Sequence, residues 1–146
     1  MEENFDCLKL ENQLCFPLYA CSKEIVRKYK IFLDKIDLTY TQYIVMMVLW
    51  DKRQINVKSL GEYLFLDSGT LTPVLKKMET KGYITRNRLK NDERNLIISI
   101  TQKGTELKNK AKSIPIKIKN CVNLSKKDSE KLYSILYKIL NNVKED

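Results

Sequence analysis

The sequence contains no histidine, and this absence removes several kinds of active site. Without histidine the chain cannot form a Ser-His-Asp triad or a Cys-His nucleophile pair, and most catalytic zinc sites are excluded. The four cysteines include no C-x-x-C spacing, so neither a zinc knuckle nor a thioredoxin-like motif is indicated. We therefore expect a protein that is not an enzyme and that holds no metal and no cofactor.

Long hydrophobic runs and a secretory leader are also missing. No apolar run approaches the roughly 18 residues that a membrane helix needs. The first six residues are acidic rather than basic, which argues against a signal peptide. We expect a cytoplasmic protein with no membrane attachment, and its cysteines should be reduced at rest. These cysteines are Cys7, Cys15, Cys21 and Cys121.

Positive charge is abundant and unevenly placed. The 146 residues, 43% hydrophobic and 31% charged, are typical of one globular domain with a net charge of +9. Residues 76–94 carry seven cations against three anions, and residues 103–119 carry six against one. Such a surface suits a polyanion such as DNA, although a solvated lysine-rich face is the alternative.

Apolar periodicity and capping residues predict a chain made mainly of helices. Residues from about 11 to 35 show one helical stripe, and Pro17 requires that this helix begins close to it or kinks. Residues 39–42 form a capping box for a second helix. Asn56 can cap a short third helix over 57–64, and Asp67 or Ser68 can cap a fourth that stops at Gly82.

The second half of the chain begins with strand-like runs. Residues 83–89 and 96–100 flank a charged tip at 90–95 and predict a hairpin. Thr101 can cap a long lysine-rich helix that reaches about Cys121, and Ser125 can cap a last apolar-striped helix.

This order of elements predicts a mainly α protein with a small β-hairpin wing, a winged helix-turn-helix. We expect one domain over 1–146, in which about 39–101 bind DNA. The helices at about 7–36 and 102–144 are too apolar to stand alone, so they should form a homodimer.

In this fold the recognition helix reads bases, here through Ser68, Thr70, Thr72 and Lys76. Phosphate or wing contacts are expected from Lys77, Arg86, Arg88, Lys90 and Arg94, with ordinary solvation as the alternative for Lys77 and Lys90.

Residues 92–101 resemble the D-x-R-x(5)-L-T wing signature of MarR regulators, with Ile100 in place of leucine. Asp92 can pair with a nearby arginine, and Arg94 sits where the wing enters a minor groove. The segments 11–16, 18–20, 38–40, 42–43 and 66–73 look like the organic hydroperoxide regulators, the OhrR group, and their staphylococcal redox relatives. The resemblance implies a symmetric dimer that represses a peroxidase gene from a palindromic operator in double-stranded DNA. Pro17, Cys7 and Cys21 depart from the pattern.

The resemblance also places a peroxide-reactive thiol at Cys15 and two supporting tyrosines at Tyr29 and Tyr40. Only a thiolate attacks a peroxide, and tyrosine hydroxyls can donate hydrogen bonds to it. On one helix Cys15 and Tyr29 would lie about 21 Å apart, so they can meet only if two copies run antiparallel across a dimer. Phe16 and Tyr19 would line the pocket or core. By residues alone, Cys15 would be a small buried hydrophobe.

Oxidised Cys15 would be a sulfenic acid that a second thiol can capture. Cys121 resembles the resolving cysteine of the two-cysteine OhrR branch; otherwise a low-molecular-weight thiol would cap Cys15. Cys21 lies on a different side of the same helix, so local closure is not expected.

Three other functions are weighed against this one. A MarR regulator could release DNA on binding a small aromatic ligand, with Cys15 a bystander. A thiol peroxidase would consume peroxide catalytically, but no thioredoxin-type pattern supports it. A sequence-blind architectural protein would bind operator and random DNA equally.

Replacement of Arg94 by alanine tests the wing assignment. Operator affinity should fall severely because one cation leaves the minor groove, while the dimer stays folded. A salt titration of the dissociation constant, paired with size-exclusion chromatography, measures both. Unchanged affinity would refute the wing assignment.

Overall fold

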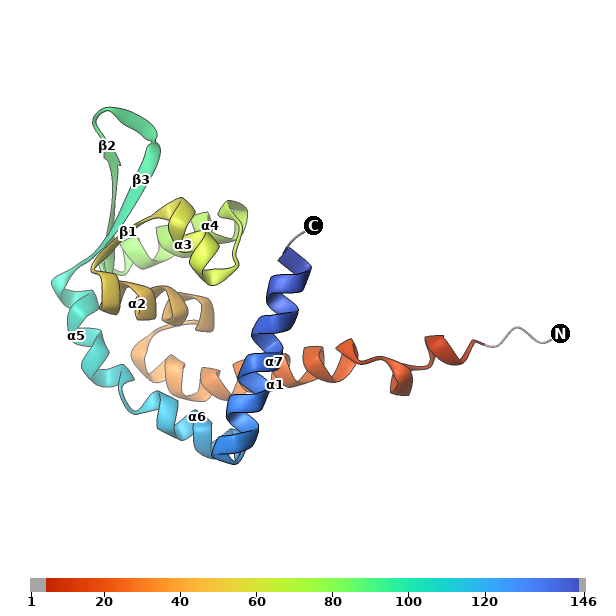
Figure 1. The fold of residues 1–146 in the computed structure, drawn as a ribbon. Helices are drawn as coiled ribbons and strands as arrows, with labels where there is room; N and C mark the ends of the chain where they lie inside the picture. The colour runs from red at the N-terminus through yellow and green to blue at the C-terminus, as the bar shows by residue number, and fades with distance from the viewer. Residues whose placement is uncertain (1–4, 145–146) are drawn as a thin grey trace. The chain divides into compact units, whose positions relative to one another are not determined.

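A computed structural model gives the structure of residues 5–144, except for the side chains of Glu93 and Arg94. By their internal contacts the residues divide into two compact units, Met1–Ile114 and Pro115–Asp146. The first unit holds helices and the sheet, and the second unit is helical (Figure 1). The helices are α1 (Cys15–Leu33), α2 (Tyr40–Lys52), α3 (Val57–Leu64), α4 (Ser68–Thr80), α5 (Gln102–Ala111), α6 (Ile114–Val122) and α7 (Lys126–Lys144). The strands are β1 (Gln54–Asn56), β2 (Ile84–Leu89) and β3 (Asp92–Ile100).

The first helix begins later than the sequence predicts. Leu10–Asn12 forms a 3-10 turn, and α1 starts only at Cys15. Pro17 therefore lies in the first turn, where a backbone N–H has no partner within the helix and its absence costs little. The predicted start near Glu11 is wrong, and the expectation that the helix begins close to Pro17 is confirmed. Another 3-10 turn, Asp34–Ile36, follows α1.

Capping residues fix the helix-turn-helix where the sequence predicts it. Thr39 and Gln42 form the reciprocal capping box of α2. The Asn56 side chain accepts hydrogen bonds from the first amides of α3. Asp67, rather than Ser68, caps α4. Each of these side chains satisfies amides that the helix itself leaves unpaired, so the local sequence suffices to set the starts of the three helices.

The sheet has the strand order β1-β3-β2 and is antiparallel throughout. β2 and β3 pair from Ile84 with Ile100 to Leu89 with Asp92, which leaves Lys90 and Asn91 as the turn. The predicted charged tip at 90–95 is therefore too long, because β3 begins at Asp92. The three-residue β1 was not predicted, since its pairing with β3 comes from a distant segment. In Figure 1 the β2–β3 hairpin extends beyond the helices of its unit as a wing.

The long lysine-rich helix expected from Thr101 to about Cys121 is two helices. Thr101 caps α5, as predicted, but α5 ends at Ala111 and α6 begins at Ile114. Pro115 explains the break, because proline has no N–H for the Ala111 carbonyl four residues earlier. Ser125 accepts a hydrogen bond from the Asp128 amide at the start of α7, so that predicted cap is confirmed.

The core of the first unit lies between α2, α3, α4 and the sheet. Its fully buried side chains include Met46, Leu49, Leu60, Leu71, Leu75, Met78 and Ile98. The Trp50 indole donates a hydrogen bond to the Gly104 carbonyl at 2.9 Å and so joins α2 to α5. Among the described residues no helix is both long and apolar enough to span a bilayer.

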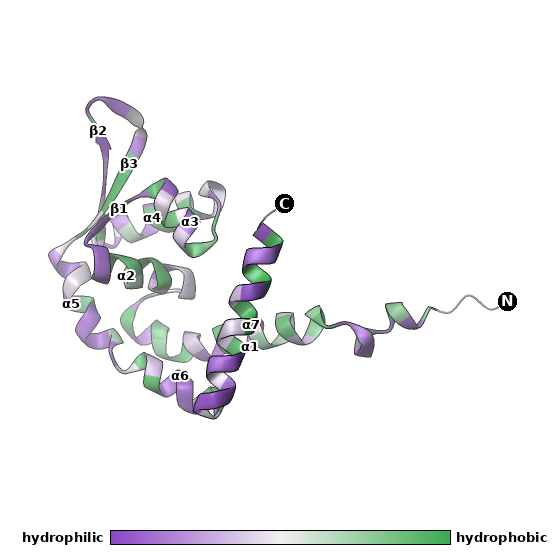
Figure 2. Ribbon diagram, in the orientation of Figure 1, coloured by the Kyte–Doolittle hydropathy of each residue, from purple (hydrophilic) through white to green (hydrophobic). Residues whose placement is uncertain are grey.

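Two helices leave apolar surface uncovered in a single chain. Leu33 is the only buried residue of α1, and α7 has no buried residue. Figure 2 shows apolar positions recurring along both helices. The expected fold class, a mainly helical winged helix-turn-helix, is confirmed. The domain boundaries stay a prediction.

Substitution of Gly104 by alanine should destabilise the first unit. A Cβ at this position would lie 2.3 Å from the Tyr83 carbonyl oxygen, which is backbone and cannot move aside cheaply. We expect the free energy of unfolding to fall by about 1–3 kcal/mol, as for other overpacked sites. Urea unfolding followed by circular dichroism measures it.

Gly69→Ala is the milder comparison, because its Cβ would meet only Asp67 Oδ1, at 3.0 Å, on an exposed side chain that can shift. That oxygen also caps α4, so the strained cap and the higher helix propensity of alanine oppose each other and should keep the stability within about 1 kcal/mol of the unmodified protein. Equal stability of the two variants would contradict the packing described here.

Candidate nucleic-acid interface and thiol site

The recognition helix α4 is held at both ends by its own sequence. Asp67 accepts hydrogen bonds from the Thr70 amide at 2.8 Å and the Thr70 hydroxyl at 3.1 Å, and these bonds lower the pKa of its carboxyl group. At the other end Gly82 has a φ of 78°, its N–H bonds the Glu79 carbonyl, and the Tyr83 N–H bonds the Met78 carbonyl. This is a Schellman motif, in which the left-handed residue is ordinarily glycine.

The outer face of α4 carries hydroxyls and lysines. Leu71, Leu75 and Met78 are buried on the inner face. The five residues expected to contact DNA from this helix are all exposed: Ser68, Thr70, Thr72, Lys76 and Lys77. The Thr72 hydroxyl donates to the Ser68 carbonyl at 2.8 Å, and the Thr70 hydroxyl donates to Asp67. The hydrogens of both threonines are thus used within α4, and the oxygens can still accept hydrogen bonds from outside.

The wing residues fall into two groups. Arg88, Lys90 and Asp92 are exposed near the hairpin turn, and the side chain of Arg94 lies outside the described residues. Arg86 is instead half-buried at the base of the wing. Its guanidinium contacts Glu79 at 2.8 and 2.9 Å, and its amide donates to the same carboxylate at 3.0 Å. This ion pair attaches β2 to the end of α4, so Arg86 has a structural role besides the predicted phosphate contact.

Cys15 is the first residue of α1 and is exposed. No acidic residue lies in the first turn, and no side chain caps it. The amides at a helix N-terminus favour a negative charge nearby, and here no carboxylate of that turn offsets them. Phe16 and Tyr19, the other residues expected around the thiol, are exposed in the same two turns, and Lys23 lies over the Tyr19 ring at 5.1 Å.

Tyr29 and Tyr40 lie close together, as two hydroxyls that donate to the same thiolate would require. Their ring centroids are 4.9 Å apart, although one ring comes from α1 and the other from the first turn of α2. Tyr43 completes the cluster at 5.7 Å from Tyr29 and 6.5 Å from Tyr40. Burial, followed by the proximity of Tyr40 and Tyr43, raises the pKa of Tyr29 to about 12. The phenols are therefore neutral over the physiological range and can donate hydrogen bonds.

The cysteine and the tyrosine cluster are separated within one chain. α1 is uninterrupted from Cys15 to Leu33, so the fourteen steps along the helix from Cys15 to Tyr29 correspond to about 21 Å. Cys121 is exposed on α6, most of which belongs to the other unit. The described residues contain no group of three or more cysteine, aspartate or glutamate side chains placed to hold a metal ion.

The sequence analysis did not identify two residues of these sites, one in the tyrosine cluster and one at the base of the wing. Tyr43 is buried and contacts both other tyrosines, and its three-residue spacing from Tyr40 on one helix could have indicated this. Glu79 pairs with Arg86 from seven residues away across a turn, and no local pattern signals that pair.

Comparisons with known proteins agree with this geometry. The family model of the transcriptional regulators SarA/Rot matches residues 27–111, more than half of the chain. The organic hydroperoxide resistance transcriptional regulator of Bacillus subtilis (strain 168) is 50% identical over 143 residues, 98% of this chain and 97% of the relative. Reduced AbfR bound to DNA, from Staphylococcus epidermidis, is similar with 33% identity and a TM-score of 0.77, covering 92% of this chain and 94% of that one. AbfR with its disulfide formed has 34% identity and a TM-score of 0.64, covering 90% and 92%.

A capped recognition helix with an exposed polar face, followed by an antiparallel wing, defines a winged helix-turn-helix regulator of transcription. The chain belongs to the MarR family of these regulators, within the organic hydroperoxide resistance (OhrR) group. The family resemblance carried by residues 66–73 and 92–101 is thereby confirmed.

The ionisation of Tyr29 gives a direct test of the tyrosine cluster. Folding raises the pKa of Tyr29 from 10.0 to about 12. The neutral Tyr29 phenol therefore contributes stability to the folded protein that is fully present below pH 10 and is lost as the pH rises through 12. In a titration of tyrosinate absorbance, Tyr29→Phe should remove an ionisation step near pH 12. In urea all tyrosines should titrate near pH ~10. An unchanged high-pH limb in the variant would contradict the cluster.

Proposed function

We propose that this protein is a homodimeric repressor that binds a palindromic operator and releases it when an organic hydroperoxide oxidises Cys15. The observation that carries this proposal is the layout of α1. One uninterrupted helix presents an exposed thiol at its first residue and a tyrosine packed on Tyr40 near its other end. Residues of about 39–101 form the DNA-binding part, and about 7–36 and 102–144 form the dimer.

DNA binding is supported by charge and by the exposed face of α4. The chain has a net charge of +9, and the outward residues of α4 and the wing can contact bases and phosphates. Lysines and arginines supply affinity for phosphate, while Ser68, Thr70, Thr72 and Lys76 face the base edges. The similar AbfR was solved bound to DNA.

Dimerisation is supported by the apolar surface that a single chain leaves open. Leu14, Phe16, Leu18, Ile25 and Val26 are exposed on and just before α1. The exposed apolar side chains of α7 include Leu132, Ile135, Ile139, Leu140 and Val143. Contiguous apolar faces of this extent are typical of subunit interfaces, and their burial would stabilise the dimer.

A two-fold axis between the subunits would also bring Cys15 of one chain to the tyrosine pair of the other. When two copies of α1 run antiparallel, the first turn of one lies beside the later turns of the other. Cys15 of each subunit then faces the Tyr29–Tyr40 pair of the partner. Two neutral phenols donating hydrogen bonds would stabilise a thiolate in a site without histidine.

The chemistry of sensing balances with the hydroperoxide as the only oxidant. The Cys15 thiolate attacks the terminal peroxide oxygen, an S–O bond forms and the O–O bond breaks. Sulfur loses two electrons and becomes a sulfenic acid, while the peroxide leaves as an alcohol after its alkoxide takes up a proton. A second thiol then displaces water and forms a disulfide.

Two thiols compete for the role of resolving partner. Cys121 is exposed, and a bond from it to Cys15 would cross the dimer and require movement; a low-molecular-weight thiol is the alternative. A disulfide form of the similar AbfR supports the first. Either disulfide of Cys15 removes the thiolate that the phenols bind.

DNA release would follow from the spacing of the recognition helices. The two helices must stay about 34–36 Å apart to match one DNA turn, so a small rotation of the subunits breaks the register and releases the operator.

Cys15→Ser separates sensing from DNA binding. The variant should bind operator as tightly as the unmodified protein, because Cys15 lies outside α4 and the wing, yet it should ignore cumene hydroperoxide. Fluorescence anisotropy before and after oxidation measures release. Cys7→Ser and Cys21→Ser are matched controls that should respond normally.

Mass spectrometry of the oxidised protein should find the modification on Cys15, and Cys121→Ser should show whether the disulfide is with that residue. A Cys15→Ser variant that still releases DNA on oxidation would contradict the proposal. Release by an aromatic acid, with Cys15 unmodified, would favour a ligand-responsive regulator instead.

A further inference from the structure

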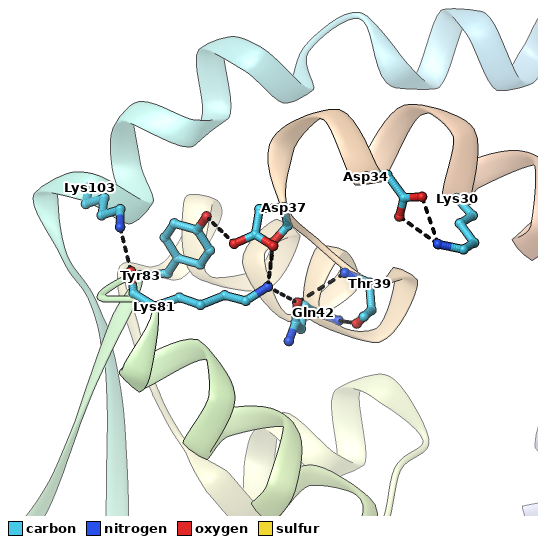
Figure 3. Close-up of polar contacts among 8 residues, drawn as sticks. All are labelled: Lys30, Asp34, Asp37, Thr39, Gln42, Lys81, Tyr83 and Lys103. Atoms are coloured by element: carbon cyan, nitrogen blue, oxygen red, sulfur yellow. Dashed lines mark hydrogen bonds and ion pairs between the residues drawn. The ribbon is translucent and has the colours of Figure 1, made fainter.

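The side chain of Lys81 connects the end of the recognition helix to the junction between α1 and α2 (Figure 3). Lys81 is the C-cap residue of α4. Its ammonium group lies 2.8 Å from the Asp37 carbonyl, 2.9 Å from the Asp37 carboxylate and 3.4 Å from the Gln42 amide oxygen. A lysine ammonium has three hydrogens, and here each has an acceptor. All three acceptors come from one short segment that is remote in sequence.

That segment also sets the position of the tyrosine cluster. Gln42 is 3% exposed and forms the capping box with Thr39, whose amide donates to the Gln42 oxygen at 3.1 Å. Tyr40 lies between them as the first residue of α2 and packs on Tyr29. One side-chain oxygen of Gln42 therefore contacts both the start of the helix that carries Tyr40 and the cation at the end of α4.

We propose that Lys81 and Asp37 are positioning residues that couple the Tyr29–Tyr40 cluster to the orientation of the recognition helix. This inference rests on the proposed function, because the cluster matters to DNA release only if it contacts Cys15. When oxidation displaces Tyr40, the first turn of α2 moves, and the Lys81 contacts carry that displacement to α4. Without the ammonium, the cluster and the recognition helix respond separately.

The backbone at Asp37 is built for a fixed contact. Asp37 has a φ of 54°, in the left-handed region that aspartate and asparagine tolerate better than most residues. This conformation accompanies the contact of both its carbonyl and its carboxylate with Lys81. The Tyr83 hydroxyl lies 3.5 Å from the other carboxylate oxygen, so Asp37 meets the α4–β2 turn through two residues.

A second set of contacts holds the same turn independently of the Lys81 side chain. The Lys103 ammonium bonds the Lys81 carbonyl at 2.7 Å, and the Thr101 hydroxyl bonds the Gly82 carbonyl at 2.6 Å. These contacts come from the start of α5 and satisfy carbonyls that α4 leaves unpaired. Loss of the Lys81 side chain should therefore leave α4 folded and in place, with only its link to the α1–α2 junction removed.

Lys81→Met tests the coupling, since it keeps the aliphatic stem and removes the ammonium. The release factor is the operator dissociation constant of the oxidised protein divided by that of the reduced protein. We expect Lys81→Met to lower this factor at least about fivefold, while the affinity of the reduced form changes less. Asp37→Asn keeps the left-handed backbone and an oxygen acceptor, so its effect should be smaller and in the same direction.

The Lys30–Asp34 ion pair supplies the control. Lys30, in the last turn of α1, bonds Asp34, the residue that follows the helix, at 2.7 Å and does not contact α4 (Figure 3). Lys30→Met changes the net charge by the same amount and should leave the release factor unchanged. The rate of sulfenic acid formation on Cys15, trapped with dimedone, should be equal in all variants, which a general loss of structure would not allow. Thermal unfolding verifies that each variant is folded.

A wild-type release factor in both Lys81→Met and Asp37→Asn, with Cys15 oxidised normally, overturns the coupling and leaves the sensor intact. If the unmodified protein is oxidised on Cys15 and keeps its operator, the proposed function and the coupling fail together. An equal fall in the Lys30→Met control would also overturn the proposal, because charge alone would then explain the effect.

Discussion

The fixed rise of an α-helix governs how this protein can build a thiol sensor. α1 carries Cys15 and Tyr29 on one uninterrupted helix, and at about 1.5 Å per residue no side chain can bridge the gap between them. The tyrosines instead gather around Tyr40 and Tyr43 from α2, where burial keeps them protonated. The proposed sensor, made from these parts, would therefore be shared between two chains. The arrangement of the subunits and the chemistry of the thiol would then depend on each other.

Local rules account for the elements that the sequence predicts correctly. Thr39, Asn56, Asp67, Thr101 and Ser125 each satisfy backbone amides of the helix that follows, and Gly82 takes the left-handed conformation that ends α4. These features depend on a few neighbouring residues, so the amino-acid sequence alone is enough to place the helix-turn-helix. The exposure of the expected recognition-helix residues and the proximity of Tyr29 to Tyr40 agree with the same placement, while their roles toward DNA and the thiol stay predictions.

The sequence predictions fail where a proline or a contact with a residue far away in the chain determines the structure. Pro115 breaks the long lysine-rich helix that the sequence predicts, and Pro17 fits because α1 starts at Cys15. β1 exists only because β3 pairs with it, and Glu79 meets Arg86 only because the chain turns between them. The ammonium of Lys81 is similar: its three acceptors lie about forty residues earlier in the chain. Contacts of this kind have no local signature.

The bare apolar faces of α1 and α7 have a consequence for the amount of protein a cell must keep. In the proposed dimer these faces are covered only by a second copy, so folding and association are linked by mass action. The melting temperature of such a protein rises with its concentration, and dilution weakens the fold and operator occupancy together. The cellular concentration of the protein would then influence the degree of repression, as peroxide does.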